Sequence, residues 1–196
     1  FTHGRGLTWN PDERVQAYTH PMWMFLISSV YLFTNEIYFT SIIISLIISL
    51  GAIVLFAWKI PDSPGGVITG FAILCMSKTF IDYTTSGLEN PLTFFLMVLF
   101  FIVYLKRESL EEHLFLLSFL ASLCALNRLD TIVLYVPPLF YAYIRSKKWV
   151  TGVLAVFMGF FPLYLWTGFS LIYYGFPFPN TAYAKLNTGV DPLIYI

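Results

Sequence analysis

The chain has 196 residues, of which 58% are hydrophobic, 19% aromatic and only 11% charged. A soluble domain carries about 25% charged residues, so this composition, with a mean hydropathy of +0.73, excludes the water-soluble fold classes and indicates an integral membrane protein. The formal net charge is zero, which argues against nucleic acid as a partner because nucleic acid requires a basic surface.

Seven apolar segments follow a polar beginning and predict helices. They cover 21–34, 40–58, 66–84, 91–105, 113–127, 131–144 and 149–174. A helix that crosses a bilayer needs about 20 apolar residues, a length that 40–58, 66–84 and 149–174 reach by themselves. The shorter segments need flanking residues to span, or they border a water-filled cavity instead of lipid. Cys75 and Cys124 lie inside these runs and are interpreted as small buried hydrophobes.

Basic residues gather in three short loops between the apolar segments, at Lys59, 106–107 and 145–148. The positive-inside rule places such loops in the cytoplasm. Because crossings alternate, the turns at 85–90 and 127–130 then lie outside, as does the chain after the last apolar segment. The sequence therefore predicts six spanning helices, with most of the other polar residues on the outer face.

The first apolar segment, 21–34, is interpreted differently from the rest. It is short for a span and begins with Pro21, a residue typical of a helix start. Trp23 and Tyr31 suit the headgroup region. We therefore expect a helix lying in the outer interface, which keeps the residues before it outside.

These patterns predict three regions in an all-α, polytopic transmembrane helix bundle. They are an outer-face loop with the interfacial helix at 1–39, the bundle itself at 40–174, and at 175–196 an outer-face loop with the start of a further apolar segment. The chain begins without Met and ends in an apolar run, so we expect it to be a fragment of a longer chain.

Four motifs on the expected outer face carry a resemblance to a known family. They are GRGLTWNPDERVQAYTHPMW at 4–23, TTSGLENPLTFFL at 84–96, ALNRLDT at 125–131 and YYGFPFPNTAYAKL at 173–186. In this order they resemble the polyprenyl-phosphate-sugar-dependent membrane glycosyltransferases of the GT-C class, nearest to the branch of the mycobacterial terminal arabinofuranosyltransferases.

The resemblance implies a GT-C-like fold and an inverting transfer of sugar from a polyprenyl-phosphate donor. The acceptor would be a cell-envelope glycan, lipid or protein at the outer face of the bacterial cytoplasmic membrane. The family's acidic motif, with its catalytic or metal-binding carboxylates, would lie before Phe1, so the fragment itself is expected to lack it. The resemblance leaves undecided whether the enzyme uses a divalent cation, such as Mg²⁺ or Mn²⁺, as a cofactor. Where relatives often show Arg-Pro-Asp, this chain has Arg128, Leu129 and Asp130.

Transfer from a lipid-phosphate donor needs cations that hold the departing phosphate. Arg is the natural bidentate partner of phosphate, and Lys acts as a point charge. Arg128 and Lys185 are the best-placed outer cations, followed by Arg14 and His20. Alternatively, Lys185 would only snorkel to lipid headgroups.

The same transfer needs groups that bind the sugar and a base for the acceptor hydroxyl. Trp9, Tyr18 and Trp23 would stack on a sugar face or pack against the lipid chain, or else the tryptophans would anchor the interface. The other expected substrate-contacting residues are Glu13, Asn90, Asn180 and Tyr183. Glu89 and Asp130 are the candidate catalytic carboxylates within this chain, and Glu89 would orient an acceptor hydroxyl or help to hold a metal.

Simpler interpretations stand beside these roles. Arg128 and Asp130 would form an interfacial ion pair, and Lys78 and Asp82 would pair locally across one helical turn. Glu89 would be a favourable charge at a helix N-terminus. The rival function is a non-catalytic transporter or lipid-handling protein of cell-envelope assembly, whose mark would be charges within helix centres and broken helices.

Overall fold

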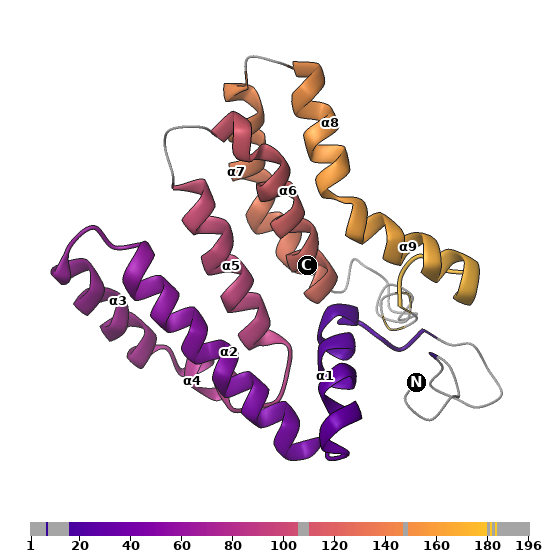
Figure 1. Cartoon of the computed structure of the whole chain (residues 1–196), viewed down its shortest axis with the longest axis horizontal. Coiled ribbons are helices and arrows are strands. Elements are labelled where there is room, and N and C mark those ends of the chain that lie inside the picture. Colours follow the sequence, from indigo (N-terminus) through magenta and orange to yellow (C-terminus); the bar gives the residue numbers. More distant parts are fainter. Residues whose placement is uncertain are drawn as a thin grey trace, which may run out of the picture. The chain divides into compact units, whose positions relative to one another are not determined.

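The computed structural model describes Leu7, residues 16–105, 110–146 and 149–179, Thr181 and Tyr183, without the side chains of 110–112. Its elements are α1 (Pro21–Thr34), α2 (Tyr38–Lys59), α3 (Pro64–Met76), α4 (Lys78–Thr84), α5 (Asn90–Tyr104), α6 (Leu110–Asn127), the 3₁₀ helix η1 (Leu129–Thr131), α7 (Ile132–Arg145), α8 (Trp149–Gly159) and α9 (Phe161–Tyr174). Every regular element in these residues is helical, which confirms the all-α prediction (Figure 1). The chain divides into two units, residues 20–163 and residues 1–19 with 164–196.

Local signals explain where the helices begin. α1, α3 and α5 each carry a proline in the first turn. The N–H groups of a first turn have no acceptor within the helix, so proline, which lacks this group, loses no hydrogen bond there. At the start of α2 the Glu36 carboxylate accepts hydrogen bonds from the backbone N–H groups of Tyr38 (2.8 Å) and Phe39 (2.7 Å). The predicted apolar segments therefore reappear as helices whose ends shift by only a few residues. α1 coincides with the segment expected in the membrane interface, and that location stays a prediction.

Two long apolar segments are broken instead of continuous. Segment 66–84 forms α3 and α4, which bend by 75° at Ser77. The Ser77 hydroxyl accepts a hydrogen bond from the backbone N–H of Phe80 (3.3 Å) and so caps α4. Segment 149–174 forms α8 and α9, and Pro162 near the break cannot donate to the preceding turn. The expectation of a continuous helix is wrong at both places.

Among the described residues, one helix, α2, is long and apolar enough to cross a membrane. Up to three spans result if α3 with α4 and α8 with α9 each count as one. The outward sides of the helices are apolar, since Ile47 and Leu50 on α2 are 64% and 62% exposed. Such surfaces suit hydrocarbon better than water. Six crossings stay a prediction.

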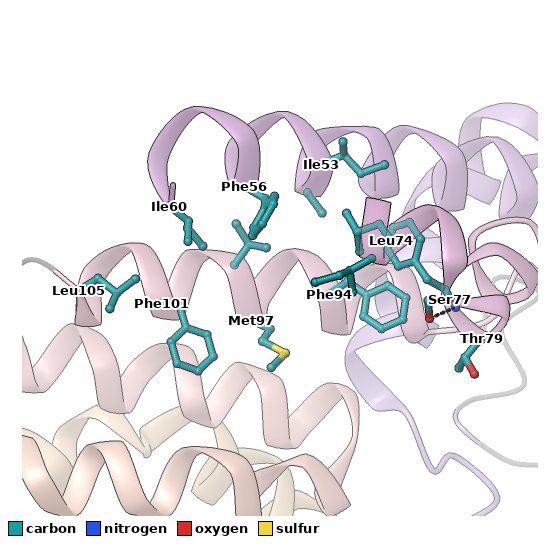
Figure 2. A pocket seen from close by; sticks show the side chains of 14 residues that line it. Ile53, Phe56, Ile60, Leu74, Ser77, Thr79, Phe94, Met97, Phe101 and Leu105 are labelled. Atoms are coloured by element: carbon teal, nitrogen blue, oxygen red, sulfur yellow. Dashed lines mark hydrogen bonds between the residues drawn. The ribbon is translucent and has the colours of Figure 1, made fainter. Parts of the chain in front are cut away.

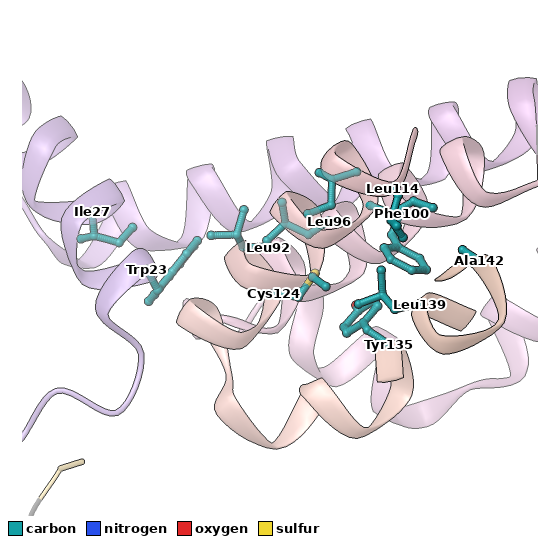
Figure 3. Close-up of a cluster of buried hydrophobic side chains, with 13 residues drawn as sticks. Trp23, Ile27, Leu92, Leu96, Phe100, Leu114, Cys124, Tyr135, Leu139 and Ala142 are labelled. Carbon is teal, nitrogen blue, oxygen red and sulfur yellow. The ribbon is translucent and has the colours of Figure 1, made fainter. Parts of the chain in front are cut away.

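Helix α6 is the centre of the unit formed by 20–163 and contacts α5, α7 and α8. Its Leu117 and Cys124 are fully buried, beside Phe100 of α5 and Tyr135 of α7, whose rings meet edge to face at 4.8 Å (Figure 3). α8 comes close to α6 at Gly159, where a Cβ atom would lie 2.9 Å from backbone atoms of α6. This packing holds the start of α5 beside the end of α6.

The two cysteines differ in their surroundings. Both are free, Cys124 is buried as predicted, and Cys75 is exposed. Cys75 lies on α3, a helix with no buried residue, so its predicted burial inside the protein is wrong.

Candidate functional site

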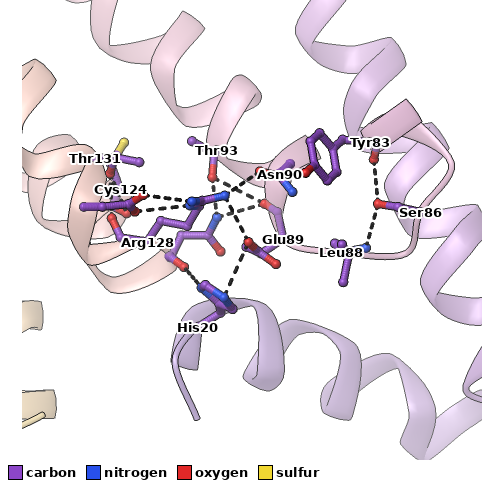
Figure 4. Close-up of polar contacts among 12 residues, drawn as sticks. His20, Tyr83, Ser86, Leu88, Glu89, Asn90, Thr93, Cys124, Arg128 and Thr131 are labelled. Carbon is purple, nitrogen blue, oxygen red and sulfur yellow. Dashed lines mark hydrogen bonds and ion pairs between the residues drawn. The ribbon is translucent and has the colours of Figure 1, made fainter. Parts of the chain in front are cut away.

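Polar side chains from three separate stretches of the chain meet at one end of the unit formed by 20–163 (Figure 4). His20 directly precedes α1, Glu89 directly precedes α5, and Arg128 directly follows α6. Because α5 and α6 are packed neighbours, the start of one lies beside the end of the other. These stretches belong to three of the four motifs that carry the family resemblance.

Arg128 uses most of its guanidinium for contacts within the protein. Its Nε and Nη2 donate to the two carboxylate oxygens of Asp130, at 3.2 Å and 2.8 Å. Its Nη1 donates to Asn90 Oδ1 at 2.8 Å and to Glu89 Oε1 at 3.3 Å. The ion pair that the sequence left open is therefore present, and Asn90, a predicted substrate contact, is part of the same cluster.

The two carboxylates around Arg128 differ in exposure. The side chain of Asp130 is 67% exposed, whereas that of Glu89 is only 8% exposed. The hydrogen bonds from Arg128 lower the pKa of Asp130 and, in return, raise the pKa of Arg128. Asp130 is thus the most exposed charged residue of the cluster, whereas Glu89 is buried against Nη1 of Arg128.

His20 contacts both the start of α5 and the end of α6. Its Nδ1 lies 2.9 Å from the backbone oxygen of Asn127, the last residue of α6, and its Nε2 lies 3.5 Å from Glu89 Oε1. A positive group is favoured at a helix C-terminus and a negative one at an N-terminus. Arg128 at the end of α6 and Glu89 at the start of α5 follow this rule.

Asn127 is fully buried and connects the end of α6 to the start of α5 through its side-chain amide. Its Nδ2 donates to the backbone oxygen of Glu89 (2.9 Å) and to Thr93 Oγ1 (2.8 Å), while its Oδ1 has no hydrogen-bond partner among the described residues. Neither Asn127 nor Thr93 was among the predicted site residues. The signal for Asn127 was a polar residue ending an apolar helix, directly before Arg128.

Trp23 connects α1 to the turn before α5. Its indole N–H donates to the backbone oxygen of Gly87 at 3.1 Å, and its ring is buried in the core. Gly87 has a φ of +71°, which favours glycine, and a Cβ there would lie 2.9 Å from the Ser41 hydroxyl. The ring of Trp23 therefore packs against protein and offers no open face to a sugar.

Two predicted substrate contacts lie in the other unit. Tyr18 is half-buried, and burial raises the pKa of its hydroxyl, with a smaller contribution from Tyr173. Tyr183 is exposed, and its ring packs against Phe176 at 5.7 Å. In the same unit Gln16 is fully buried and donates to Ser170 at 3.2 Å.

Five predicted site residues lie outside the described part of the chain. They are Trp9, Glu13, Arg14, Asn180 and Lys185. Their roles stay predictions.

The residues of the cluster do not form a metal site. Among the described residues, no group of three or more His, Cys, Asp or Glu side chains could hold a metal ion. Glu89 and Asp130 both bind Arg128 instead, so the expected role of Glu89 in holding a metal does not fit its surroundings.

An apolar cavity lies in the same unit, among α2, α3, α4 and α5 (Figure 2). Its volume is about 530 Å³, and Phe56, Leu74, Phe94 and Met97 are among the side chains that line it. Its lining contains neither a charged residue nor any residue of the polar cluster.

No family model, curated protein or solved structure matches this chain.

Proposed function

We propose that the protein is a multi-pass membrane glycosyltransferase. It moves a sugar from a polyprenyl-phosphate donor to a cell-envelope acceptor at the outer face of the bacterial cytoplasmic membrane. The observation that carries the proposal is the meeting of His20, Glu89 and Arg128 at one end of an apolar helix bundle. Three of the resembling motifs are far apart in sequence, and the fold brings their polar residues together.

The cluster contains the chemical groups that the transfer requires. An acceptor hydroxyl attacks the anomeric carbon, the bond from that carbon to the phosphate oxygen breaks, and the phosphate leaves with the electron pair. The hydroxyl proton goes to a carboxylate base. Arg128 is suited to hold the leaving phosphate, because a guanidinium binds phosphate with two parallel hydrogen bonds.

The proposed membrane arrangement follows from the loops. Six crossings place the end of the bundle that carries Glu89 and Arg128 outside, where a lipid-linked donor and an envelope acceptor meet. The basic residue Arg145 at the end of α7 then lies on the cytoplasmic side. Apolar helix surfaces that are exposed in the isolated chain support contact with lipid.

The test is sugar transfer by the intact protein in proteoliposomes, supplied with a panel of radiolabelled polyprenyl-phosphate sugars and envelope acceptors. We expect transfer from one donor and a loss of at least about 100-fold in Arg128→Ala, the size typical of removing one charge-stabilising group. Arg145→Ala is the matched control, since Arg145 is exposed at the other end of α7. Transfer that survives Arg128→Ala refutes the role of Arg128, and no transfer from any donor refutes the function.

A second candidate is a lipid-handling protein without catalysis. Two observations favour it: the apolar cavity among α2 to α5, and helices broken at Ser77 and before Pro162. It predicts that fluorescent lipids cross proteoliposome membranes in the presence of the protein while no sugar transfer occurs. Lipid movement without transfer supports this candidate, and transfer without lipid movement rejects it.

A further inference from the structure

The ring of His20 has a defined tautomer. Its Nδ1 faces the backbone oxygen of Asn127 at 2.9 Å, and a carbonyl oxygen can only accept. Nδ1 therefore carries a hydrogen. In a neutral imidazole the other nitrogen, Nε2, then has a lone pair and no hydrogen.

This tautomer constrains the contact between His20 and Glu89. Nε2 lies 3.5 Å from Glu89 Oε1, and an ionised carboxylate also presents only lone pairs. Two acceptors facing each other repel, so the contact is attractive only when one proton is held by the pair. Glu89 is buried and His20 is 34% exposed at its side chain, so a proton reaches the pair through His20.

Arg128 lies on the other side of the same carboxylate oxygen. Its Nη1 is 3.3 Å from Glu89 Oε1, while Asp130 occupies the fork formed by Nε and Nη2. Since Asp130 is mostly exposed, an incoming anion can take its place on this fork. That anion then approaches the negative charge of Glu89, unless the proton on the pair with His20 offsets it.

We infer that this cluster is a proton-linked binding site for a tetrahedral dianion. The anion replaces Asp130 on the Arg128 fork and is bound together with one proton on the pair of His20 and Glu89. The ligand class is a phosphate monoester or free phosphate. The inference rests on the proposed function only for the expectation that the anion is the departing lipid phosphate.

Among the described residues, the charged and titratable groups of the cluster come from four neighbouring elements besides His20 before α1. Glu89 before α5 and Asp130 in η1 interact with His20, Arg128 after α6 interacts with both carboxylates, and Tyr83 on α4 interacts with Arg128. Asp130 has a lowered pKa, so it stays charged through the weakly acidic range in which histidines ordinarily titrate. The variants at His20 and Glu89 then assign a change in anion affinity over that range to the pair.

The experiment is titration of the intact protein in detergent with inorganic sulfate, which remains a dianion throughout. Affinity is measured by calorimetry from pH 8.5 to pH 5.5, in two buffers with different ionisation enthalpies so that proton uptake is counted. We expect affinity to rise about tenfold as the pH falls, the effect of one nearby charge at a half-exposed site. At the alkaline end, binding takes up a proton. An affinity that does not change with pH overturns the inference.

Variants assign the effect to residues. His20→Gln should remove the pH dependence, because no imidazole then remains beside the anion, whereas Glu89→Gln should strengthen binding at pH 8.5 and so weaken the pH dependence. Asp130→Asn should strengthen binding several-fold at every pH without removing the pH dependence. Lys78→Gln is the control, because Lys78 is 86% exposed and pairs with Asp82. A pH dependence of full size in His20→Gln overturns the inference, as does unchanged binding at pH 8.5 in Glu89→Gln, and helicity is checked for each variant.

The source of the anion is resolved by displacing bound sulfate with inorganic phosphate or with farnesyl phosphate. Stronger displacement by farnesyl phosphate identifies a lipid headgroup, equal displacement identifies free phosphate, and no displacement by either overturns the site. Proton-linked sulfate binding without any sugar transfer would refute the proposed glycosyltransferase and leave this site intact. Sugar transfer without proton-linked sulfate binding would refute this site and support the proposed glycosyltransferase.

Discussion

Arg128 and Asp130 form a two-pronged ion pair across a gap of one residue, with Nε and Nη2 of the guanidinium 3.2 Å and 2.8 Å from the two carboxylate oxygens. The pair is possible because Leu129 starts η1, so the chain turns directly after α6. The contact holds the guanidinium over the start of α5, within reach of Asn90 and Glu89.

The pair should contribute stability that depends on pH. The pKa of Asp130 is lowered in the folded protein, so its contribution is present above the ordinary pKa of Asp, about 3.9, and is lost as the pH falls through the lower folded value. Because Asp130 is 67% exposed, the effect should stay below about 1 kcal/mol. Thermal unfolding in detergent should therefore show Asp130→Asn less stable than the wild type at pH 7. The difference should shrink as the pH falls below the ordinary pKa of Asp, and a difference that stays the same at acidic pH would contradict the prediction.

Removing the buried amide of Asn127 should destabilise the protein more strongly. Asn127→Ala leaves the backbone oxygen of Glu89 without its amide donor and deprives Thr93 of a partner. The Glu89 oxygen still accepts from the backbone N–H of Thr93 at 3.2 Å, so the cost is that of two lost hydrogen bonds, about 0.5–1.5 kcal/mol each. Unfolding measurements should show a loss of this size, against almost none in the exposed control Lys78→Gln. A neutral Asn127→Ala would mean that water replaces the amide.

Two glycines should respond in opposite ways to the same substitution. Gly87→Ala forces a side chain into a backbone with φ of +71° and places its Cβ 2.9 Å from the Ser41 hydroxyl, so we expect a loss of about 1–2 kcal/mol. Gly168 lies inside α9 with nothing within 4 Å of a Cβ, so Gly168→Ala should be neutral or stabilising by up to about 1 kcal/mol. The melting temperatures of the two variants test the contrast. Equal shifts would refute the strain assigned to Gly87.

Membrane topology can be tested by labelling cysteines placed in two loops of the unit formed by 20–163. Ser86 and Asp62 are both exposed, at opposite ends of the region from α3 to α4. In a Cys75→Ala background, Ser86→Cys should react with an impermeant maleimide added to intact cells, whereas Asp62→Cys should react only after permeabilisation. The reverse pattern would invert the proposed topology. Gln16 is unsuitable for such a label because it is fully buried.

The positions of the helices follow from local sequence, whereas their continuity does not. An apolar run such as 40–58 has few alternatives to a helix, and proline near a helix start or a side-chain cap such as Glu36 sets its first residue. Ser77, Lys78 and Thr79 interrupt the apolar pattern of 66–84, but three polar residues alone do not show that one helix ends and another begins there. The 75° bend there depends on packing and on a single capping hydroxyl, which periodicity does not reveal.

The sequence by itself determined that this is an apolar, helical chain whose polar motifs lie between helices, because composition and hydrophobic run length are local properties. It also singled out His20, Glu89, Asn90, Arg128 and Asp130 as candidates. Only the tertiary structure decided that these residues touch, that Glu89 is buried while Asp130 is exposed, and that the buried Asn127 donates a hydrogen bond to the backbone of Glu89. It also turned Trp23 from a candidate sugar contact into a core residue. The physical reason is that these contacts join residues up to 107 positions apart, and the packing of α6 against its neighbours alone brings them within hydrogen-bonding distance.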